Sequence, residues 1–417
     1  MNNIFPQVRL GDVCEYYTGR IAAKLLDEKT YISTENMLSE KGGITVSSGL
    51  PTIAIIPEYK KDNILLSNIR PYFKKIWVAT QNGGCSNDVL VLKAKDNYFP
   101  KFLYYVLSDD KFFDYSTATS KGTKMPRGDK VAIMQYSVPD IPYEKQRIIS
   151  ATLSCLDDKI ELNNRLNANL EAQAQAIFKN WFVDFEPFQD GEFVDSELGK
   201  IPKGWRVGTL DECIDFSNGY AFESSKLLDK EENNCYYVFK MGHIKKGGGL
   251  NTGGTKSWVR KKDFAELSKY VLRYGDILMC MTDMKSNVAL LGHTAVIYEK
   301  DKYIVNQRVG LLRINNEVGI GFPYIYILTN HSDFLEDLRK RANSGVQVNL
   351  STTEIKKSKL IIAPTNINTD FNNLTKPLFD FIYHNELENT HLKTIRDTLL
   401  PRLVSGEIEV PIEENQK

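Results

Sequence analysis

The sequence predicts an α+β protein in which two duplicated α/β domains are joined by two long helices. Three observations support this fold class: the two halves of the 417-residue chain repeat each other, each half contains a heptad pattern, and short strand-like runs occupy much of the rest. The composition, 42% hydrophobic and 25% charged, is that of an ordinary globular protein. It excludes a disordered chain, a collagen and a disulfide-rich mini-protein.

The internal repeat relates the two helical stretches by a constant offset. Asn163 and Asn167 recur as Asn385 and Asn389, and the apolar positions around them keep the same offset. Toward the N-terminus the offset shrinks, because Ile64 matches Ile277 and Leu10 matches Leu210. We therefore expect a duplicated unit whose helical part is fixed and whose N-terminal part differs by insertions.

The helical stretches carry the heptad pattern of a coiled coil, because apolar and Asn positions recur at alternating spacings of three and four. Two Asn in each seam penalise slipped registers, in which their amides would be buried without partners. The matching Asn positions favour pairing of the two helices with each other; the alternative is two separate helices, each packed on its own domain. The predicted pairing seam consists of Leu156, Ile160, Asn163, Asn167, Leu170 and Ile177 in the first helix and Leu378, Ile382, Asn385, Asn389, Leu392 and Leu399 in the second.

Shorter elements lie between loops rich in Gly, Asn and Lys. Strands are expected at residues 53–56, 89–92, 276–280 and 309–314, and short helices at 102–107 and 334–342. Prolines and glycines between residues 186 and 204 indicate a linker. The predicted order is domain 1 at residues 1–141, a long helix at 142–186, a linker at 187–204, domain 2 at 205–366, a second long helix at 367–406 and a tail at 407–417.

Cysteine usage and hydropathy predict a cytoplasmic protein. None of the six cysteines forms a Cys-x-x-Cys pair, and even the closest two, Cys213 and Cys235, are far apart in the chain. This spacing fits reduced thiols in a reducing compartment better than disulfides or a zinc site. No apolar run approaches the roughly 18 residues of a membrane span, and the N-terminus lacks the features of a signal peptide. We expect no membrane partner and no bound metal.

The net charge of zero hides two kinds of segment. Residues 1–141 carry 18 basic and 15 acidic residues, and residues 200–366 carry 25 and 18. Residues 142–199 carry 5 and 11, and residues 367–417 carry 5 and 9. Both domains are therefore basic, as contact with nucleic-acid phosphates requires, whereas both helical arms are acidic and suit protein partners better.

Two loops at equivalent places of the repeat combine cations with other polar side chains. Residues 120–127 and 339–349 align, with Gly122 opposite Gly345. Gln347 or Asn349 is suited to bidentate pairing with adenine, and an arginine to pairing with guanine; for any single cluster the alternative is a solvated surface. The candidate DNA-binding residues are Arg70, Lys74, Lys75, Lys121, Thr123, Lys124, Arg127, Lys245, Lys246, Arg260, Lys261, Arg339, Lys340, Arg341, Gln347 and Asn349.

No catalytic constellation is found in the sequence. Gly249 and Gly254 have the spacing of a P-loop, but Thr255 stands where its lysine is required. An adenine amino-methyltransferase needs an Asn/Asp-Pro-Pro-aromatic segment, and the nearest approach, residues 69–72 (Ile-Arg-Pro-Tyr), lacks the acid or amide and one proline. Metalloprotease and serine-hydrolase motifs are absent as well. We expect no catalytic residue and no cofactor bound by this chain.

Three stretches resemble a known family. Residues 178–188 (FKNWFVDFEPF) and 196–205 (SELGKIPKGW) are similar to the central region of specificity subunits of type I restriction–modification systems, and residues 399–408 (LLPRLVSGEI) to their C-terminal ending. The resemblance implies two target-recognition domains joined by an antiparallel coiled coil, each domain recognising half of a bipartite DNA site. It also implies two modification subunits, which bind S-adenosylmethionine and methylate adenine N6, and restriction subunits, which use ATP and Mg²⁺; catalysis lies on these partners.

We therefore expect a non-catalytic DNA-recognition subunit with an asymmetric target, since the two domains differ in sequence. The duplication also predicts a pseudo-two-fold that brings Met1 near the end of the second long helix. A close alternative is the specificity subunit of a related system in which one partner both cuts and methylates. A stand-alone DNA-binding regulator, a protein adaptor and a self-sufficient methyltransferase are the more distant rivals.

Overall fold

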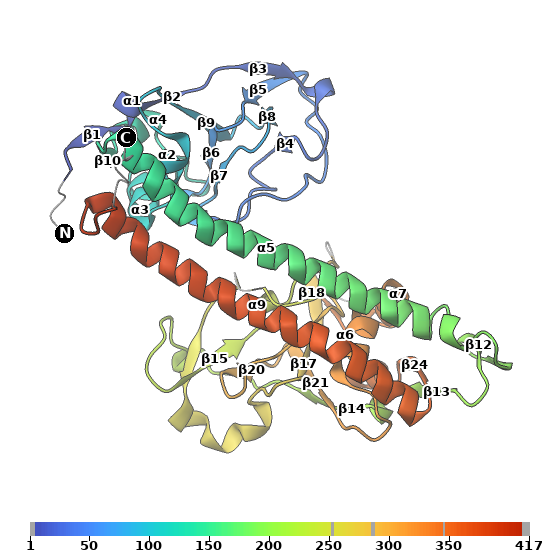
Figure 1. The fold of residues 1–417 in the computed structure, drawn as a ribbon. Coiled ribbons are helices and arrows are strands. Elements are labelled where there is room, and N and C mark those ends of the chain that lie inside the picture. The colour runs from blue at the N-terminus through green and yellow to red at the C-terminus, as the bar shows by residue number, and fades with distance from the viewer. Residues whose placement is uncertain (1–4, 252–253, 285–287, 345–346, 411–417) are drawn as a thin grey trace, which may run out of the picture. The chain divides into compact units, whose positions relative to one another are not determined.

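A computed structural model describes residues 5–251, 254–284, 288–344 and 347–410 of the chain. Met1, Gly345 and the last part of the predicted tail, 411–417, lie outside the described residues. The chain forms two compact units: unit 1 comprises Met1–Leu162 and Glu388–Lys417, and unit 2 comprises Asn163–Leu387. Two long helices, α5 (Tyr143–Phe182) and α9 (Thr365–Ser405), each contribute to both units (Figure 1). The predicted α+β class with two long helices is confirmed.

In unit 1 the described residues form two four-stranded sheets and one strand pair. The first sheet has the order β2-β9-β6-β7, and its two central strands are continuous apolar runs, as burial of both faces requires. The strands are β1 (Gln7–Arg9), β2 (Cys14–Tyr16), β3 (Arg20–Ala22), β4 (Tyr31–Ile32), β5 (Ile55–Tyr59), β6 (Ile64–Ser67), β7 (Ile76–Val78), β8 (Gly83–Cys85), β9 (Val89–Ala94) and β10 (Ser137–Pro139). The second sheet has the order β3-β5-β8-β4, and β1 pairs with β10.

Unit 2 repeats this plan with insertions. Its four-stranded sheet, β14-β21-β17-β19, matches the first sheet of unit 1 strand for strand, and β13 pairs with β24 as β1 pairs with β10. The remaining sheets are β16-β15-β20, β18-β23-β22 and the hairpin β11-β12. The strands are β11 (Phe193–Ser196), β12 (Gly199–Pro202), β13 (Arg206–Thr209), β14 (Ile214–Asn218), β15 (Cys235–Phe239), β16 (Trp258–Arg260), β17 (Ile277–Cys280), β18 (Thr282–Met284), β19 (Thr294–Val296), β20 (Tyr303–Val305), β21 (Val309–Ile314), β22 (Asn343–Ser344), β23 (Gln347–Asn349) and β24 (Lys359–Ile362).

Short helices follow the repeat closely. Proline occupies the first turn of both α2 and α6, where its missing N–H costs no hydrogen bond. The Asp109 carboxylate caps α3 by accepting from the Lys111 amide. The helices are α1 (Leu10–Val13), α2 (Pro100–Leu107), α3 (Asp110–Ala118) and α4 (Lys130–Met134) in unit 1, and α6 (Phe322–Asn330), α7 (Ser332–Lys340) and α8 (Thr352–Lys356) in unit 2. Helices α3 and α4 recur as α7 and α8 at the same offset that relates the two long helices.

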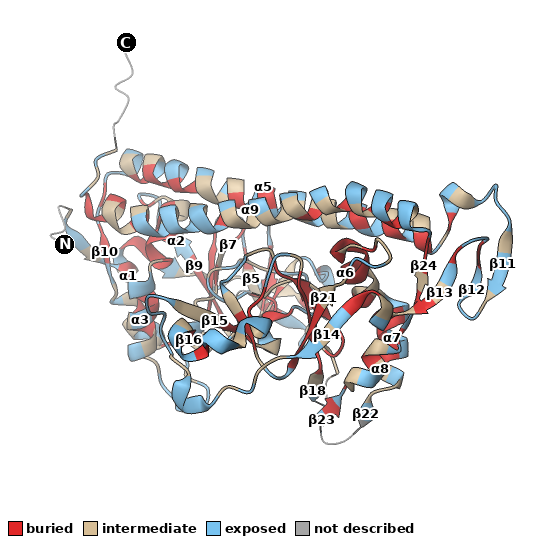
Figure 2. Cartoon of the chain, turned by 90° about the horizontal axis from the view of Figure 1, so that it is seen from below, coloured by how far each residue is buried: buried red, intermediate tan, exposed pale blue. Residues whose placement is uncertain are grey.

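The long helices pair with each other inside each unit. In unit 1 the first half of α5 contacts the second half of α9, and Arg396 Nη1 lies 2.7 Å from Asp157 Oδ1. In unit 2 the second half of α5 contacts the first half of α9, where Asn385 Nδ2 donates to Asn167 Oδ1 at 2.8 Å. The pairing is therefore antiparallel. All twelve predicted seam residues are buried or half-buried, and buried and exposed residues alternate along both helices (Figure 2).

The segment that composition indicates as a linker is largely ordered. It contains a short 3₁₀ helix, Glu186–Phe188, and the hairpin β11-β12. Aromatic packing explains the order, because the rings of Phe185 and Phe188 meet Trp205 edge-on at centroid distances of 5.6 and 4.9 Å. The glycine that suggests flexibility, Gly199, has φ +96° and closes the hairpin turn instead.

Each unit has its own core, to which a long helix contributes. In unit 1, Leu400 and Leu403 of α9 pack with Phe102 and Phe112, and in unit 2, Phe178 and Phe182 of α5 pack with Tyr324. Within the described residues, no helix is long and apolar enough to cross a membrane.

Candidate nucleic-acid interface

The three-stranded sheet β18-β23-β22 of unit 2, called the ribbon below, brings together predicted base-contacting residues. Its strands are antiparallel, with Asn349 opposite Thr282 and Gln347 opposite Met284. Side chains alternate along β23, so Val348 is turned into the core at 8% exposure while Gln347 and Asn349 are exposed. The ribbon therefore presents two amides on one outward face.

Cations flank the ribbon. Arg339 Nε donates to the Leu291 carbonyl at 2.9 Å, and the Leu291 amide in turn donates to the Asp283 carboxylate of β18 at 3.3 Å. Burial, reinforced by the positive charges of Arg339 and Lys246, lowers the pKa of nearby His293, although a hydrogen bond with Asn330 opposes the shift. The charges of Arg339 and Lys246 thus both act on His293. Arg339, Lys340 and His293 line an open crevice of about 680 Å³. Such a cationic surface is suited to phosphate contact.

The equivalent loop of unit 1 is also exposed and basic. Lys121 and Arg127 face each other in an isolated β-bridge, and Ile69 bridges to Arg127 from the other side. Arg127 Nη2 lies 2.9 Å from Asp88 Oδ1, and Lys121 Nζ lies 2.5 Å from Asp129 Oδ2. Thr123 and Lys124 are exposed at the tip of the loop. The loop therefore holds its two bridging cations in place by carboxylates while leaving them open to solvent.

Three further candidates in unit 1 are engaged in internal contacts. Lys74 Nζ lies 3.1 Å from Asp110, and Lys75 donates to the Thr34 carbonyl at 2.6 Å. Burial lowers the pKa of Lys75. Arg70 has the left-handed φ of +50°, and its amide donates to the Pro126 carbonyl at 2.8 Å. These contacts give Lys74 and Lys75 roles in the packing of unit 1, and they place Arg70 directly beside the Lys121–Arg127 loop.

The other candidates in unit 2 divide into exposed and engaged groups. Lys245 and Lys246 are exposed. Arg260 forms a two-pronged ion pair with Glu232, and Lys261 lies over the Tyr236 ring. Lys340 Nζ pairs with Glu336 at 2.7 Å. Arg341 is held by Asp337 at 2.7 Å, Glu354 at 3.2 Å and Ser358 at 2.9 Å, a set of partners typical of a structural arginine. Their contact with DNA stays a prediction.

Sequence reasoning missed the strand that completes the ribbon. Thr282, Asp283 and Met284 carry no cation and no motif, so only their pairing with β23 makes them part of the surface. The signal that could have found them is the repeat itself, because the offset that matches Ile64 with Ile277 also matches Ile69 with Thr282.

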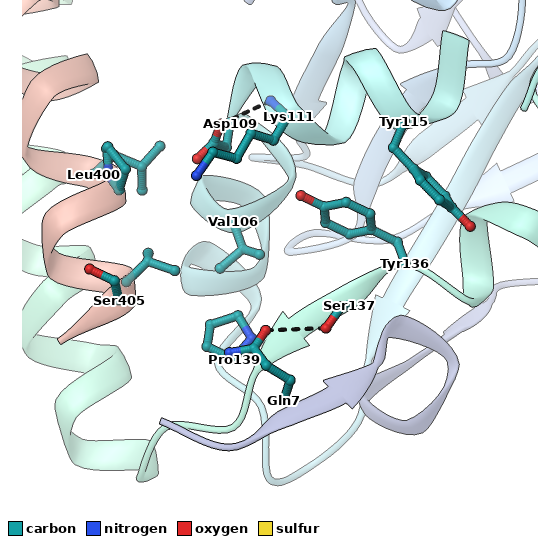
Figure 3. Close-up of a pocket in the computed structure, with 12 residues that line it drawn as sticks. Gln7, Val106, Asp109, Lys111, Tyr115, Tyr136, Ser137, Pro139, Leu400 and Ser405 are labelled. Atoms are coloured by element: carbon teal, nitrogen blue, oxygen red, sulfur yellow. Dashed lines mark hydrogen bonds between the residues drawn. The ribbon is translucent and has the colours of Figure 1, made fainter. Parts of the chain in front are cut away.

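Two crevices occupy equivalent places in the repeat, one in each unit. The crevice of unit 1 encloses about 720 Å³ between α3 and the end of α9 (Figure 3), and that of unit 2 encloses about 660 Å³ between α7 and the end of α5. Most lining residues of the first recur at the repeat offset in the second, among them Val106 as Leu328 and Leu400 as Phe178. Apolar character is kept at these positions, whereas charge is not, since Lys111 is replaced by Asp333.

Metal-binding and nucleophilic groups do not gather in the part of the chain that the structure describes. No group of three or more His, Cys, Asp and Glu side chains in that part is placed to hold a metal ion. Burial raises the pKa of the Cys14, Cys85 and Cys213 thiols to about 12, which keeps them protonated at neutral pH. The exposed surface with the clearest chemistry is therefore the ribbon and its counterpart.

Two units built from equivalent elements, each with an exposed polar surface at the same place of the repeat, define a duplicated protein. The type I restriction modification DNA specificity domain matches residues 5–172 and again residues 202–397. The chain therefore belongs to the family of type I restriction–modification specificity subunits.

Similarities to individual proteins support this family membership. The chain is 29% identical over 343 residues, 79% of its length and 73% of the relative's, to the type I restriction enzyme MjaIX specificity subunit of Methanocaldococcus jannaschii. It is 25% identical, over 97% of its length and 99% of the relative's, to the HindI specificity subunit of Haemophilus influenzae. Its fold is similar to the crystal structure of the type I restriction–modification S subunit from M. genitalium, with a TM-score of 0.56, 17% identity and 98% of each chain covered.

Proposed function

We propose that this chain is the non-catalytic DNA-recognition subunit of a type I restriction–modification complex, and that it recognises a bipartite, asymmetric site. The observation that carries the proposal is an exposed polar surface found at equivalent places in both units, a basic loop in unit 1 and an amide-bearing ribbon flanked by cations in unit 2. Residues 1–141 would recognise one half-site and residues 205–366 the other. Because the two sets of exposed side chains differ, the two half-sites are expected to differ as well.

The long helices are proposed to hold two modification subunits and to set the distance between the half-sites. Exposed apolar side chains on α9 support this role: Leu374 and Phe381 are one heptad apart and therefore lie on one face of the helix, beside the pairing seam. An apolar patch that several exposed side chains form on one helix face fits a protein interface better than contact with DNA. The acidic charge of both helical segments disfavours direct contact with DNA.

Catalysis is proposed to belong to the partners. Modification subunits would bind S-adenosylmethionine and methylate adenine N6, and restriction subunits would use ATP and Mg²⁺ for translocation and cleavage. This chain would supply sequence recognition and position those subunits on DNA.

Single-molecule methylome sequencing of the host, with and without the gene for this chain, tests the proposal. Loss of one bipartite adenine-methylation motif on deletion is expected, and its return on complementation is the control. An unchanged methylome in a host whose modification subunits are expressed would contradict the proposal. Purified chain should show sequence-specific gel shifts only together with modification subunits; specific binding by the chain alone would favour a stand-alone regulator.

A swap of one domain tests the assignment of half-sites. Replacing residues 200–366 by the matching segment of a relative should change one half of the motif and leave the other half as it was. A change in both halves would show that the domain assignment is wrong.

A further inference from the structure

The ribbon of unit 2 has a register-matched counterpart in unit 1. In unit 2, Asn349 is the central residue of a three-way pairing, with Thr282 on one side and Asn343 on the other. In unit 1, Arg127 is central in the same way, between Ile69 and Lys121. The offset that relates Arg127 to Asn349 also relates Lys121 to Asn343, and Ile69 is related to Thr282 by the offset of the strands around it.

This correspondence identifies which positions are equivalent on the two exposed faces, and it differs by one residue from the sequence alignment of Gly122 with Gly345. Met125 of unit 1 corresponds to Gln347, and Arg127 corresponds to Asn349. All four side chains are exposed, and the intervening residue in unit 2, Val348, anchors the ribbon in the core. The backbone frame is therefore shared by the two units while the chemistry that it presents is different.

The side-chain amides of Asn349 and Gln347 in the ribbon make different contacts. Asn349 Oδ1 accepts from the Thr282 hydroxyl at 2.8 Å, and its Nδ2 donates to the Gln347 backbone carbonyl at 3.4 Å, so this amide is used within the ribbon. Among the described residues, the side-chain amide of Gln347 has no hydrogen-bond partner. Met284, directly opposite Gln347, is exposed and apolar. An amide beside an apolar group matches the major-groove edge of an A·T pair, which offers adenine N6 and N7 next to the thymine methyl.

Arg127 has the arrangement expected of a guanine-contacting residue. Asp88 pairs with one nitrogen of its guanidinium at 2.9 Å and holds that end of the group, while the side chain stays exposed. An arginine fixed in this way is suited to bidentate contact with guanine O6 and N7. An antiparallel β-ribbon is narrow enough to enter the major groove.

We infer that the ribbon of unit 2 and its counterpart in unit 1 are the base-recognising elements of the two domains. Gln347 would contact an adenine in one half-site and Arg127 a guanine in the other. The inference rests on the proposed function and adds the residues and bases to it. Asn349 and Asp88 are positioning residues, since each acts through its neighbour.

Methylome sequencing of hosts that carry the full complex with Gln347→Ala or Arg127→Ala tests the inference. Each variant should relax one position of one half-site, from adenine for Gln347→Ala and from guanine for Arg127→Ala, with discrimination falling about ten- to a hundredfold. Lys124→Ala, which alters an exposed cation of the loop tip, should lower methylation without relaxing any position.

A variant with a changed preference and a binding measurement keep the test valid where a variant loses methylation. Gln347→Arg should shift the preference at its position from adenine toward guanine. Where a variant abolishes methylation, competition binding by the purified complex to oligonucleotides with single base changes replaces the methylome; loss of discrimination at one position supports the inference. An unchanged motif in both Gln347→Ala and Arg127→Ala, in a host that still needs the gene for methylation, overturns the inference and leaves the proposed function intact. A methylome that does not depend on the gene refutes the proposed function itself.

Discussion

Asn385 donates its amide Nδ2 to the amide Oδ1 of Asn167 at 2.8 Å, across the seam of the two long helices in unit 2. Asn385 is buried and Asn167 half-buried, so the bond compensates two polar groups that the helix pair removes from water. A one-turn slip of either helix would separate the two amides and bury them against apolar neighbours. The pair therefore favours one register over its competitors.

Replacing Asn385 by Ala should lower the stability of the chain. The substitution removes the donor and leaves Asn167 Oδ1 without it, at an expected cost of about 1–2 kcal/mol in the free energy of unfolding. A lower thermal midpoint of the full chain is the measurement. The double variant Asn167→Leu/Asn385→Leu is the informative comparison, because removal of both polar groups should restore or exceed the wild-type midpoint. If the double variant were less stable than Asn385→Ala, the two amides would do more than satisfy each other.

A half-buried ion pair should contribute more than an exposed one in the same helix pair. Asp157 accepts from Arg396 at 2.7 Å and from the Tyr105 hydroxyl at 2.7 Å, and both charged side chains are mostly shielded, at 26% and 15% exposure. Asp157→Ala should therefore cost about 2–4 kcal/mol, because it leaves a shielded guanidinium and a buried hydroxyl without this acceptor.

The matched control is the neighbouring pair between Lys159 and Glu388, 3.1 Å apart with side chains 41% and 45% exposed. Lys159→Ala should cost less than about 1 kcal/mol. Equal shifts in the thermal midpoint for Asp157→Ala and Lys159→Ala would contradict the prediction that the half-buried ion pair contributes more than the exposed one.

Unit 2 should lose stability as the pH falls from about 6.5 toward 4. Burial lowers the pKa of His243 to about 4. The unfolded chain takes up the proton near the ordinary histidine pKa of about 6.5, so it binds more protons than the folded chain in this window. The stability is thus complete above pH 6.5 and decreases as the pH falls, by up to about 3 kcal/mol for this residue.

Urea midpoints of the wild type and His243→Gln between pH 4 and 8 provide the measurement. The variant should have a flatter profile, with His293 accounting for part of the slope that remains, since its pKa is lowered as well. A wild-type profile no steeper than that of the variant would contradict the prediction.

The long helices were predictable because heptad spacing and Asn positions are local features of the sequence, and the repeat related one helix to the other. The hairpin at 193–202 was not predictable from composition. Its order depends on ring contacts between Phe185 and Phe188, which precede it in the chain, and Trp205, which follows it. For the same reason, charge alone did not separate Arg341, which three internal partners hold, from Arg127, which stays exposed. Only strand pairing brought Thr282 and Met284 to the surface that Gln347 occupies.

Phe381 should matter for assembly and not for folding. Its side chain is 55% exposed on α9, beside the seam and outside the buried core, so its replacement by Glu removes no core contact. On the proposed role of the helices, Phe381→Glu places a charge in the interface with a modification subunit and should weaken the complex by at least about tenfold. Size-exclusion chromatography of the co-expressed subunits, together with titration of the purified chain, measures the loss.

The control for this variant is Val131→Glu, which introduces the same charge at a side chain 74% exposed on α4 of unit 1. It should leave the affinity for modification subunits unchanged, because residues 1–141 are proposed to face DNA. Both variants should keep the wild-type thermal midpoint, which separates an interface defect from unfolding. Assembly of Phe381→Glu with wild-type affinity would show that the modification subunits contact another face of the chain, and equal losses for both variants would show that the added charge acts without regard to position.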